Sequence, residues 1–592
     1  MTKHILVAVA WPYANGRLHL GRVVGCLLPA DIFARYHRLV GNEVLMVSGS
    51  DTHGTPITLA ADKANITPQQ IYEAAHQSFL ESQRDLGISY DLFTHTDTEN
   101  HFKVAQDFFC RLYQQGYITP RRQKLLYSEE NGRFLPDRYV EGTCPHCGYT
   151  DARGDQCDEC GQLLDALELI DPRSSLDGSR PTVRETEHLF LDLPAFTEPL
   201  TAYLDSHAHH WRPHVLNFSR GYVQEGLLAR PITRDLDWGI PVPLPDWEEK
   251  KLYIWFENVI GYLSASIEWA QNQGKPKAWE AWWYDPQAES YYFLGKDNIP
   301  FHTINWPIWL LGVEKLYSSD ENVRLNLPTD VPANNYLSLE GQQFSTSRNW
   351  AVWLPDLLQR YDSDQIRYYL TATMPENSDT EFTWQGFVER NNNELLATWG
   401  NLVNRVLKFS FKHWGEVPNP GALRLADETL LAQIEAGFAT VGSLLAAVKL
   451  RAALQETLAL ARLVNRYLED TPWFSVIKED KLSAAKTVYT ALWAIDSLKI
   501  LLAPFLPFSS ERLHGYLGYK RPLFGDLFIQ TYQESSKVHD ALVYDGHEAT
   551  GKWEPSQLAP GQLLQAPQPL FPKLDLALIE VERARLGQAE LS

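Results

Sequence analysis

The fold is decided by one stretch near the start of the chain, Ile5-Leu6-Val7-Ala8-Val9-Ala10-Trp11-Pro12-Tyr13-Ala14-Asn15-Gly16-Arg17-Leu18-His19-Leu20-Gly21-Arg22. It begins with an apolar strand at about residues 4 to 10, and a helical pattern from Gly21 to Leu39 follows it. Where a strand ends and a helix begins, backbone N–H groups and the helix dipole favour a bound phosphate. The stretch therefore predicts the first unit of an α/β domain that binds a phosphate ligand.

Outward from this stretch, strand and helix signals continue to alternate. A second strand is expected at Glu43 to Val47 and a helix around Pro68 to Leu86, as in a parallel sheet that binds ligands at the carboxyl ends of its strands. From about Ile118 to Pro243 the sequence changes to Gly, Pro, Cys and short runs. Strand signals resume at Tyr253 to Glu257 and at Tyr291 to Gly295. We therefore expect a Rossmann-type sheet that is split by an inserted module.

The composition narrows the class of protein. The 592 residues exceed what one hydrophobic core usually serves, and 44% hydrophobic with 21% charged residues is typical of a globular chain. The net charge of -21 argues against a surface that binds nucleic acid everywhere, although it leaves room for local basic patches. We expect a cytoplasmic protein without a membrane span, because no apolar run approaches roughly 20 residues and the N-terminus lacks a signal-peptide pattern.

Four of the six cysteines form two Cys-x-x-Cys pairs, Cys144/Cys147 and Cys157/Cys160. Four thiolates in two close pairs suit a tetrahedral structural zinc site that has no open position for catalysis. The alternative is two unrelated Cys-x-x-Cys turns with reduced thiols. Because six cysteines are too few for a disulfide scaffold in a chain of this length, we expect one Zn²⁺ in a reducing compartment.

Long helical periodicities dominate from Glu389 to about Leu517, and a proline-rich stretch from Tyr544 to Ser592 ends the chain. The predicted fold class is α/β, with a split Rossmann-type parallel sheet, an inserted zinc-knuckle domain and a following α-helical bundle. The expected boundaries are 1–117 and 251–326 for the two halves of the Rossmann domain, 118–250 for the insertion, 327–388 for a linking domain, 389–543 for the bundle and 544–592 for a C-terminal tail.

The segment that ends in His19-Leu20-Gly21-Arg22 resembles the first signature of the class I aminoacyl-tRNA synthetases, and of the methionyl enzymes in particular, in their archaeal and eukaryotic style. In that family a His-x-Gly-His motif holds ATP and stabilises the pentavalent phosphate. His19 and Gly21 match the motif, but its last histidine is Arg22 here. Arginine still donates hydrogen bonds to phosphate, although its longer fork cannot take the same place as an imidazole.

The second signature of the family, a Lys-Met-Ser-Lys-Ser loop, corresponds to Gln343-Phe344-Ser345-Thr346-Ser347, which Arg348 follows. Both lysines are replaced. Loss of cations aimed at the leaving pyrophosphate should raise the barrier, since one preorganised donor is worth roughly 3 kcal/mol in comparable sites. Arg348 is the candidate for partial compensation. A Ser/Thr surface loop without function is the alternative, but the flanking segments occur in the same order in the family.

Three further stretches carry the resemblance: Ser50 to Pro56, Tyr253 to Tyr262 and Gly295-Lys296-Asp297. It implies that Asp51 holds the substrate ammonium and that Gly295 and Asp297 meet adenosine. The residues implied for methionine are Trp11, Tyr13, Asp51, Trp255, Tyr262, Asn298, His302 and Trp306. Aromatic walls can recognise methionine through sulfur–aromatic contacts worth roughly 0.3 to 1.5 kcal/mol. Each aromatic residue alone is more often core than ligand, and Trp11 stands where many family members carry a smaller apolar residue.

In the helical region, Asn401, Arg405 and Trp473 resemble the positions by which methionyl enzymes read a CAU anticodon. Asn and Arg can hydrogen-bond the edges of splayed bases, and Trp can stack on a base for roughly 1 to 3 kcal/mol. Without the family, Asn401 and Arg405 would be assigned to an exposed helix face.

The resemblance runs from about residue 4 to residue 575 and implies that L-methionine and Mg²⁺-ATP react to methionyl-adenylate, from which the methionyl group passes to tRNA(Met). The residues implied at ATP and its phosphates are His19, Gly21, Arg22, Ser345, Thr346, Ser347 and Arg348, with Arg234 near the reacting end. Two alternatives stay open: an adenylating paralogue that serves a non-tRNA acceptor, and an inactive tRNA-binding protein. We expect a monomer.

Overall fold

The opening stretch folds as its pattern predicts. β1 (His4–Val9) is buried, and its successive residues, such as Val7 and Ala8, face two different hydrophobic cores on the two sides of a sheet. Four strands extend it in parallel pairing: β2 (Glu43–Ser50), β3 (Leu92–His95), β13 (Glu289–Gly295) and β14 (Ala333–Asn334). Because β13 pairs directly with β1 across the whole insertion, the predicted split parallel sheet is confirmed.

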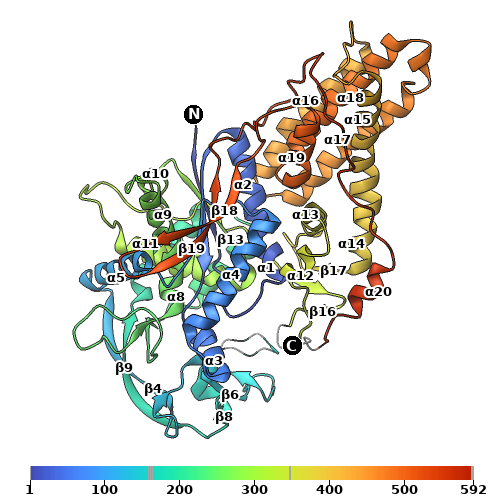
Figure 1. Cartoon of the computed structure of the whole chain (residues 1–592). Coiled ribbons are helices and arrows are strands. Elements are labelled where there is room, and N and C mark those ends of the chain that lie inside the picture. The colour runs from blue at the N-terminus through green and yellow to red at the C-terminus, as the bar shows by residue number, and fades with distance from the viewer. Residues whose placement is uncertain are drawn as a thin grey trace.

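The computed structural model describes residues 2–155, 157, 159, 160, 162, 164–345 and 348–588. Thr346 and Ser347, which the family resemblance places at ATP, lie outside the described residues. In Figure 1 the sheet and its helices form the centre and left of the molecule, the insertion lies at the bottom, and a helical bundle extends to the upper right.

Helices cover both faces of the sheet. α2 (Leu28–Val40) and α4 (Pro68–Leu86) share one core with the bundle, and the other core holds α5 (Glu99–Gln114), α9 (Gly261–Asn272) and α11 (Trp306–Val313). α4 has its predicted bounds because its N-terminus carries a capping box, in which Thr67 and Gln70 satisfy each other's backbone N–H groups. The helix ends at Leu86, where Gly87 takes a left-handed conformation and caps it.

The insertion begins with a long antiparallel pair, β4 (Ile118–Ser128) and β9 (Thr182–Leu191). Between them the chain forms a small sheet from β6 (Val140–Thr143), β7 (Ala152–Arg153) and β8 (Ile170–Ser174). This sheet has a separate small core, to which Cys144 and Cys157 belong. It lies at the bottom of Figure 1, away from the main sheet.

A linking region and a helical bundle follow the sheet. The linking region contains β15 (Leu337–Leu339), β16 (Gln342–Gln343), α12 (Leu354–Leu358), α13 (Ser363–Ala372), β17 (Thr380–Phe382) and α14 (Trp384–Arg390). The bundle contains α15 (Asn401–His413), α16 (Leu425–Ala446), α17 (Leu450–Asp470), α18 (Lys481–Leu502) and α19 (Pro507–Tyr516). Among the described residues, α16 is the one helix long and apolar enough to cross a membrane, but it packs against α17 and α18, so its length and composition are weak evidence for a span.

A C-terminal hairpin completes the sheet, which the sequence did not predict. β18 (Asp526–Gln533) and β19 (Val538–Asp545) pair antiparallel, and β19 lies antiparallel beside β3. The buried residues Ala541, Leu542 and Val543 cover the edge of β3, which would otherwise present unpaired backbone groups. The complete sheet is therefore mixed, with order β14-β13-β1-β2-β3-β19-β18. The hairpin lies across the boundary predicted between bundle and tail. The chain then returns along the bundle to α20 (Leu578–Arg583) near the linking region (Figure 1).

Candidate functional site

The carboxyl ends of β1 and β2 bring Tyr13 and Asp51 together. The backbone N–H of Ala14 donates to the Asp51 carbonyl at 2.8 Å, and the Asp51 N–H donates to the Pro12 carbonyl at 2.9 Å. The buried Asp51 carboxylate accepts a hydrogen bond from Asn258 Nδ2 at 2.6 Å. Burial, and then the neighbouring Glu257 charge, raise the pKa of Asp51 well above its ordinary value. A bound ammonium would stabilise the ionised carboxylate at this position.

A cavity of about 30 Å³ lies against Asp51. Six of the eight residues predicted for methionine line it, namely Trp11, Tyr13, Asp51, Trp255, Asn298 and His302. The volume suits about one water molecule. Trp255 closes the cavity, because its Nε1–H donates to the Tyr13 hydroxyl at 2.5 Å and its ring lies 4.2 Å from that of Phe301. These aromatic side chains must move apart before an amino-acid side chain can enter.

Three residues in the cavity wall were missed by the sequence reasoning: Asn258, Val259 and Phe301. Val259 lies four residues after Trp255, on the turns that follow α8 (Ile254–Glu257). Phe301 lies three residues after Asn298, so the two share a helical face with His302. Helical spacing from the predicted residues could have identified this wall.

Tyr262 and Trp306, also predicted for methionine, lie behind the wall and do not line the cavity. Tyr262 is fully buried, and its hydroxyl bonds His302 Nε2 at 2.7 Å. His302 Nδ1 bonds the Asn298 carbonyl at 2.8 Å. Because a carbonyl only accepts, Nδ1 carries the proton and Nε2 accepts from Tyr262. Tyr262 therefore fixes the orientation of a wall residue, and Trp306 packs against Tyr262 with ring centroids 6.4 Å apart.

The Trp11 indole packs directly against the backbone at two glycines. A Cβ atom at Gly49 would lie 2.2 Å from the Trp11 ring, and one at Gly261 would lie 2.7 Å from it. Any side chain at either position would therefore displace the indole. These close backbone approaches accommodate the large Trp11 side chain, which forms part of the cavity wall.

The two signature segments meet at His19. This residue precedes α1 (Leu20–Arg22), and its ring stacks on Phe344 of the second signature with centroids 5.2 Å apart. Gly21 permits the arrangement, because a Cβ there would lie 3.0 Å from the His19 ring. Burial lowers the pKa of His19 to about 3, with a further contribution from the Arg22 charge. The imidazole is therefore neutral at pH 7, and any positive charge at this point must come from other groups.

Arg22 folds toward the cavity. Its Nη1 donates to the Tyr13 carbonyl at 3.2 Å, and a π-helical turn, Val23–Leu27, follows it directly. Arg348 donates to Ser345 Oγ at 3.1 Å on the exposed second signature. Arg234 lies over the Tyr253 ring at 3.8 Å and does not line the cavity. The two arginines thus belong to the two chain segments that meet at the contact between His19 and Phe344.

The predicted adenosine residues lie at the end of β13. Gly295 is the last residue of this strand, and Asp297 follows in a short helical turn, Lys296–Asn298. The Asp297 carboxylate accepts a hydrogen bond from the Tyr336 hydroxyl. Asn298 of the same turn lines the cavity, so the predicted ribose and methionine contacts are neighbours in the chain.

Comparison with known proteins identifies the family. A model described as tRNA synthetases class I (M) matches residues 5–407, and one described as the anticodon binding domain of methionyl tRNA ligase matches residues 417–531. The chain belongs to the class I methionyl-tRNA synthetases. The methionine–tRNA ligases of Thermomicrobium roseum and Chloroflexus aurantiacus are 59% and 52% identical to this synthetase over 590 and 598 residues, with 99% of each chain covered.

A solved structure supports the same fold for the synthetase. The Mycobacterium tuberculosis methionyl-tRNA synthetase in complex with methionyl-adenylate superposes with a TM-score of 0.75 at 23% identity, covering 97% of this chain and 100% of that one. The relatives named here are bacterial, so the comparisons give no support to the archaeal and eukaryotic type that the motifs indicated.

The four cysteines of the synthetase's insertion form one cluster. The sulfur atoms of Cys144, Cys147, Cys157 and Cys160 all lie within 4.8 Å of one another. Cys144 Sγ and Cys160 Sγ are 3.9 Å apart, and Cys147 Sγ and Cys157 Sγ are 3.6 Å apart. Tetrahedral zinc with Zn–S bonds of about 2.3 Å separates its ligands by about 3.8 Å, so the cluster has the dimensions of such a site.

The predicted anticodon residues of the synthetase lie on the bundle. Asn401 and Arg405 are exposed on α15, and Arg405 Nη2 donates to Asn465 Oδ1 at 2.9 Å. Trp473 is only 8% exposed, because its ring packs edge-on against Phe409 with centroids 4.6 Å apart. Its neighbour Phe474 is 72% exposed. The free aromatic face at this end of the bundle therefore belongs to a residue that sequence reasoning did not select.

Proposed function

We propose that this synthetase forms methionyl-adenylate from L-methionine and Mg²⁺-ATP, and that Arg22 and Arg348 supply charge in place of the replaced histidine and lysines. The observation that carries the proposal is the stacking of Phe344 on His19, which brings the second signature to the first. Since His19 is neutral at pH 7, cations from both segments can then meet the ATP phosphates on one side of the methionine cavity.

In the first step, the methionine carboxylate attacks the α-phosphorus of ATP, and the bond to the β-phosphate oxygen breaks to release Mg²⁺-pyrophosphate. Asp51 holds the ammonium, Trp11, Tyr13, Trp255, Asn298 and His302 enclose the side chain, and Gly295 and Asp297 meet the adenosine. Gly21, Ser345, Thr346 and Ser347 are assigned to the phosphates with the arginines. In the second step, the 2′-hydroxyl of the terminal adenosine attacks the methionyl carbonyl near Arg234, and AMP leaves.

The four clustered cysteines would hold one Zn²⁺, because the distances between their sulfur atoms fit four thiolates around a tetrahedral zinc ion. A bound zinc ion supplies folding energy to the β6–β8 sheet. The cluster offers no open ligand position, and it lies in a core separate from the two that flank the main sheet. The six cysteines of the chain, all of which the structure describes, form no disulfide, and this fits a cytoplasmic, reducing location for the synthetase. The monomeric state expected from the sequence stays a prediction.

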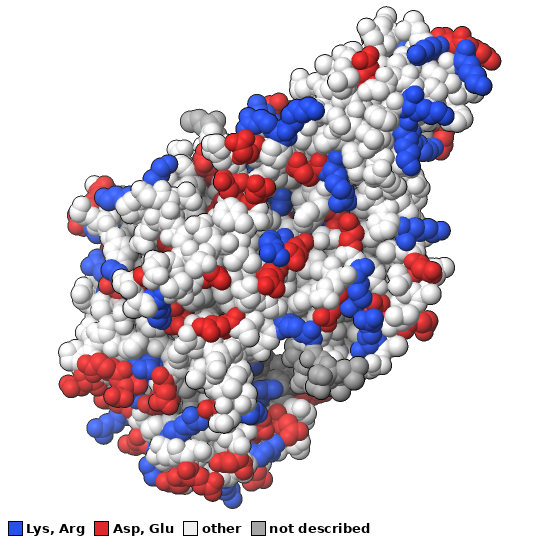
Figure 2. Space-filling model, in the orientation of Figure 1, with Lys and Arg blue, Asp and Glu red and all other residues white. Residues whose placement is uncertain are grey.

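For tRNA(Met) with a CAU anticodon, the bundle offers Asn401, Arg405 and Trp473. Exposed cations support the assignment: Arg405, Lys408 and Lys412 lie on α15, and Arg462 and Arg466 lie on α17. In Figure 2 acidic side chains gather over the insertion at the lower left, whereas Lys and Arg side chains are frequent over the bundle at the upper right. A chain of net charge -21 thus offers phosphate contacts where the anticodon is expected.

The decisive experiment measures exchange of pyrophosphate into ATP with each of the twenty amino acids, followed by charging of total tRNA. We expect exchange with methionine alone and charging of tRNA bearing CAU. Arg22→Ala should lower the exchange rate roughly a hundredfold, as loss of one preorganised donor does, whereas Arg22→His should change it only modestly. Folded, zinc-loaded protein without methionine-dependent exchange would refute the proposal.

A further inference from the structure

His53 lies two residues after Asp51 and belongs to a buried network behind the methionine cavity. Its Nδ1 bonds Glu257 Oε1 at 2.8 Å, and the other oxygen of Glu257 bonds His101 Nε2 at 2.7 Å. All three side chains are buried. Glu257 directly precedes Asn258, the residue that donates to Asp51, so the network supports the ammonium-binding carboxylate from behind.

The opposite side of His53 faces a second carboxylate. Its Nε2 lies 3.9 Å from Asp97 Oδ1, on the loop after β3. Asp97 is itself held in place, because it accepts hydrogen bonds from the Tyr72 hydroxyl at 2.7 Å and from Lys537 Nζ at 2.5 Å. Lys537 comes from the turn of the C-terminal hairpin. His53 is therefore enclosed between two fixed carboxylates, Glu257 and Asp97.

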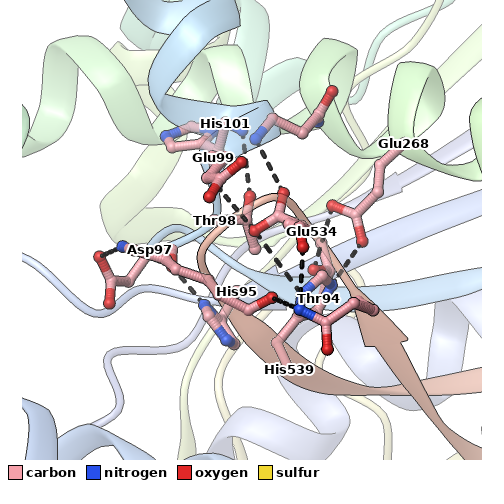
Figure 3. A network of polar contacts seen from close by, with 12 residues as sticks. Thr94, His95, Asp97, Thr98, Glu99, His101, Glu268, Glu534 and His539 are labelled. Carbon is pink, nitrogen blue, oxygen red and sulfur yellow. Dashed lines mark hydrogen bonds and ion pairs between the residues drawn. The ribbon is translucent and has the colours of Figure 1, made fainter.

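Hydrogen bonds of the Glu534 and Glu99 side chains hold the hairpin turn against the loop after β3 (Figure 3). Glu534 accepts the backbone N–H groups of Glu99 and Asn100 at 2.9 and 3.0 Å, which caps the N-terminus of α5. Glu99 in turn accepts the N–H groups of Ser535 and Ser536 at 3.1 and 2.6 Å. The position of Asp97 is thus set by a segment more than 400 residues later in the chain.

Burial raises the pKa of Asp51 most, and the charges of the network act on top of it in opposite directions. Burial alone would lower the pKa of His53, but the Glu257 and Asp97 carboxylates outweigh it and raise the pKa to about 9. His53 is therefore a cation at neutral pH. Glu257 repels charge on Asp51, and the His53 cation opposes that repulsion. Without the cation, an uncompensated Glu257 would favour the protonated form of Asp51, which cannot pair with an ammonium.

We propose that His53 is a positioning residue for methionine recognition: as a cation held between Glu257 and Asp97, it offsets the Glu257 charge beside Asp51 and so favours the ionised carboxylate that pairs with the substrate ammonium. This inference rests on the proposed assignment of Asp51 to that ammonium. It makes the C-terminal hairpin part of the support of the methionine site, since Lys537 holds the outer carboxylate.

The test is His53→Asn, whose amide can still bond Glu257 but carries no charge. In pyrophosphate exchange, the KM for methionine should rise roughly two- to thirtyfold, the range seen for residues that act through a network. The inhibition constant of L-methioninol, which keeps the ammonium and lacks the carboxylate, should rise by the same factor. Both kcat at saturating methionine and the KM for ATP should stay within about twofold of wild type, because His53 touches neither reacting group.

His76→Asn is the matched control, because His76 is equally buried nearby but bonds only Ser50 Oγ and the Asp540 carbonyl. It should leave the methionine KM unchanged. If His53→Asn fails to fold, Asp97→Asn replaces it as the test. We expect a smaller rise in the methionine KM for that variant, and an unchanged KM would overturn the inference. An unchanged methionine KM in folded His53→Asn, or equal losses in the kinetic constants for both substrates, would also overturn it. If the wild type lacks methionine-dependent exchange, the proposed function itself has failed.

Discussion

Trp11 shows how closely one wall residue of the cavity depends on the backbone around it. Its indole fits only because Gly49 and Gly261 leave the space, so the three positions form one packing unit. Within the described part of the chain its Nε1 has no hydrogen-bond partner. Burying an unpaired donor costs about 1 to 3 kcal/mol, so the indole contributes at this position through packing and not through a hydrogen bond.

We predict that Trp11→Leu relaxes selection by size. The variant leaves a void at the end of the cavity, so discrimination between methionine and ethionine, which differ by one methylene, should fall roughly tenfold. Unfolding free energy should drop by about 2 to 4 kcal/mol, as for other large-to-small core changes. Exchange kinetics with the two amino acids measure the selectivity. Trp399→Leu, another buried tryptophan, is the control, and an equal change of selectivity in both variants would contradict the prediction.

His302 gives a prediction about pH. Burial lowers its pKa to about 4, whereas the ordinary value in an unfolded chain is about 6.5. Between these values the unfolded chain binds a proton that the folded protein excludes. The His302 contribution to stability is therefore present above pH 6.5 and is lost as the pH falls toward 4, by up to roughly 1.4 kcal/mol per pH unit.

His302→Gln removes this contribution, so the difference in unfolding free energy between wild type and variant should shrink between pH 7.5 and pH 5. Urea unfolding at both values measures it, with the exposed His547→Gln as the control. A difference that is independent of pH would mean that His302 is not held neutral.

Some residues of the candidate site could be predicted from the sequence, and others could not. Motif order selected Asp51, Trp255 and His302, because each stands in a stretch whose neighbours are also recognisable, and all three line the cavity. Motif order could not distinguish the residues that line the cavity from those that hold the lining residues in place. Tyr262 belongs to the second kind, because it is fully buried behind His302, and its position depends on how α9 packs. Phe301 was missed since one more aromatic residue in an apolar helix looks like core.

At the scale of elements, the cluster of four cysteines is the part most clearly predicted from local sequence. Cys-x-x-Cys spacing places two thiolates on one turn, and a short loop brings the second pair within reach. The hairpin is the opposite case. β18 shows only a weak alternation of half-buried and exposed residues, and β19 pairs with β3, more than 400 residues earlier in the chain. No local pattern contains that partner, so the antiparallel edge was not predictable from periodicity.

We predict one zinc ion per chain, measured by metal analysis of protein purified without chelator. Cys147→Ser should lower the zinc content strongly, because it leaves three ligands, and should make residues 130–175 sensitive to protease. Cys110→Ser, which changes a cysteine outside the cluster, should keep the full zinc content. Since the β6–β8 sheet has its own core, methionine-dependent exchange should survive in both variants. Zinc content near zero in the wild type would remove the site.

At the scale of the whole molecule, the proposed function assigns two tasks to different parts of the synthetase. The cavity that Asp51 lines lies at the carboxyl end of β2, and the predicted anticodon residues lie in the bundle. The bundle extends away from the sheet (Figure 1). The two parts share a core through α2 and α4, and the hairpin after the bundle returns to the sheet, where Lys537 donates to Asp97. Sequence periodicity predicted both parts, but their contact depends on side chains from segments far apart in the chain.

This separation predicts that changes at the end of the bundle affect charging of tRNA and spare activation of methionine. Trp473→Ala should reduce charging by a factor of ten or more, since a stacked base is worth roughly 1 to 3 kcal/mol, while pyrophosphate exchange stays within about twofold. Phe474→Ala is the variant with which Trp473→Ala should be compared. Trp473 packs on Phe409 and must turn outward to stack, whereas Phe474 is already exposed and needs no rearrangement.

If Trp473 reads the anticodon, its variant loses charging and the Phe474 variant keeps it. If the exposed ring is the stacking surface, Phe474→Ala loses charging without loss of stability, and Trp473→Ala loses charging only as far as the core around Phe409 loosens. Charging kinetics with tRNA bearing CAU, together with unfolding of each variant, separate the two cases. Equal loss of exchange and charging in either variant would contradict the separation of tasks, because a residue at the end of the bundle would then be needed for the chemistry at Asp51.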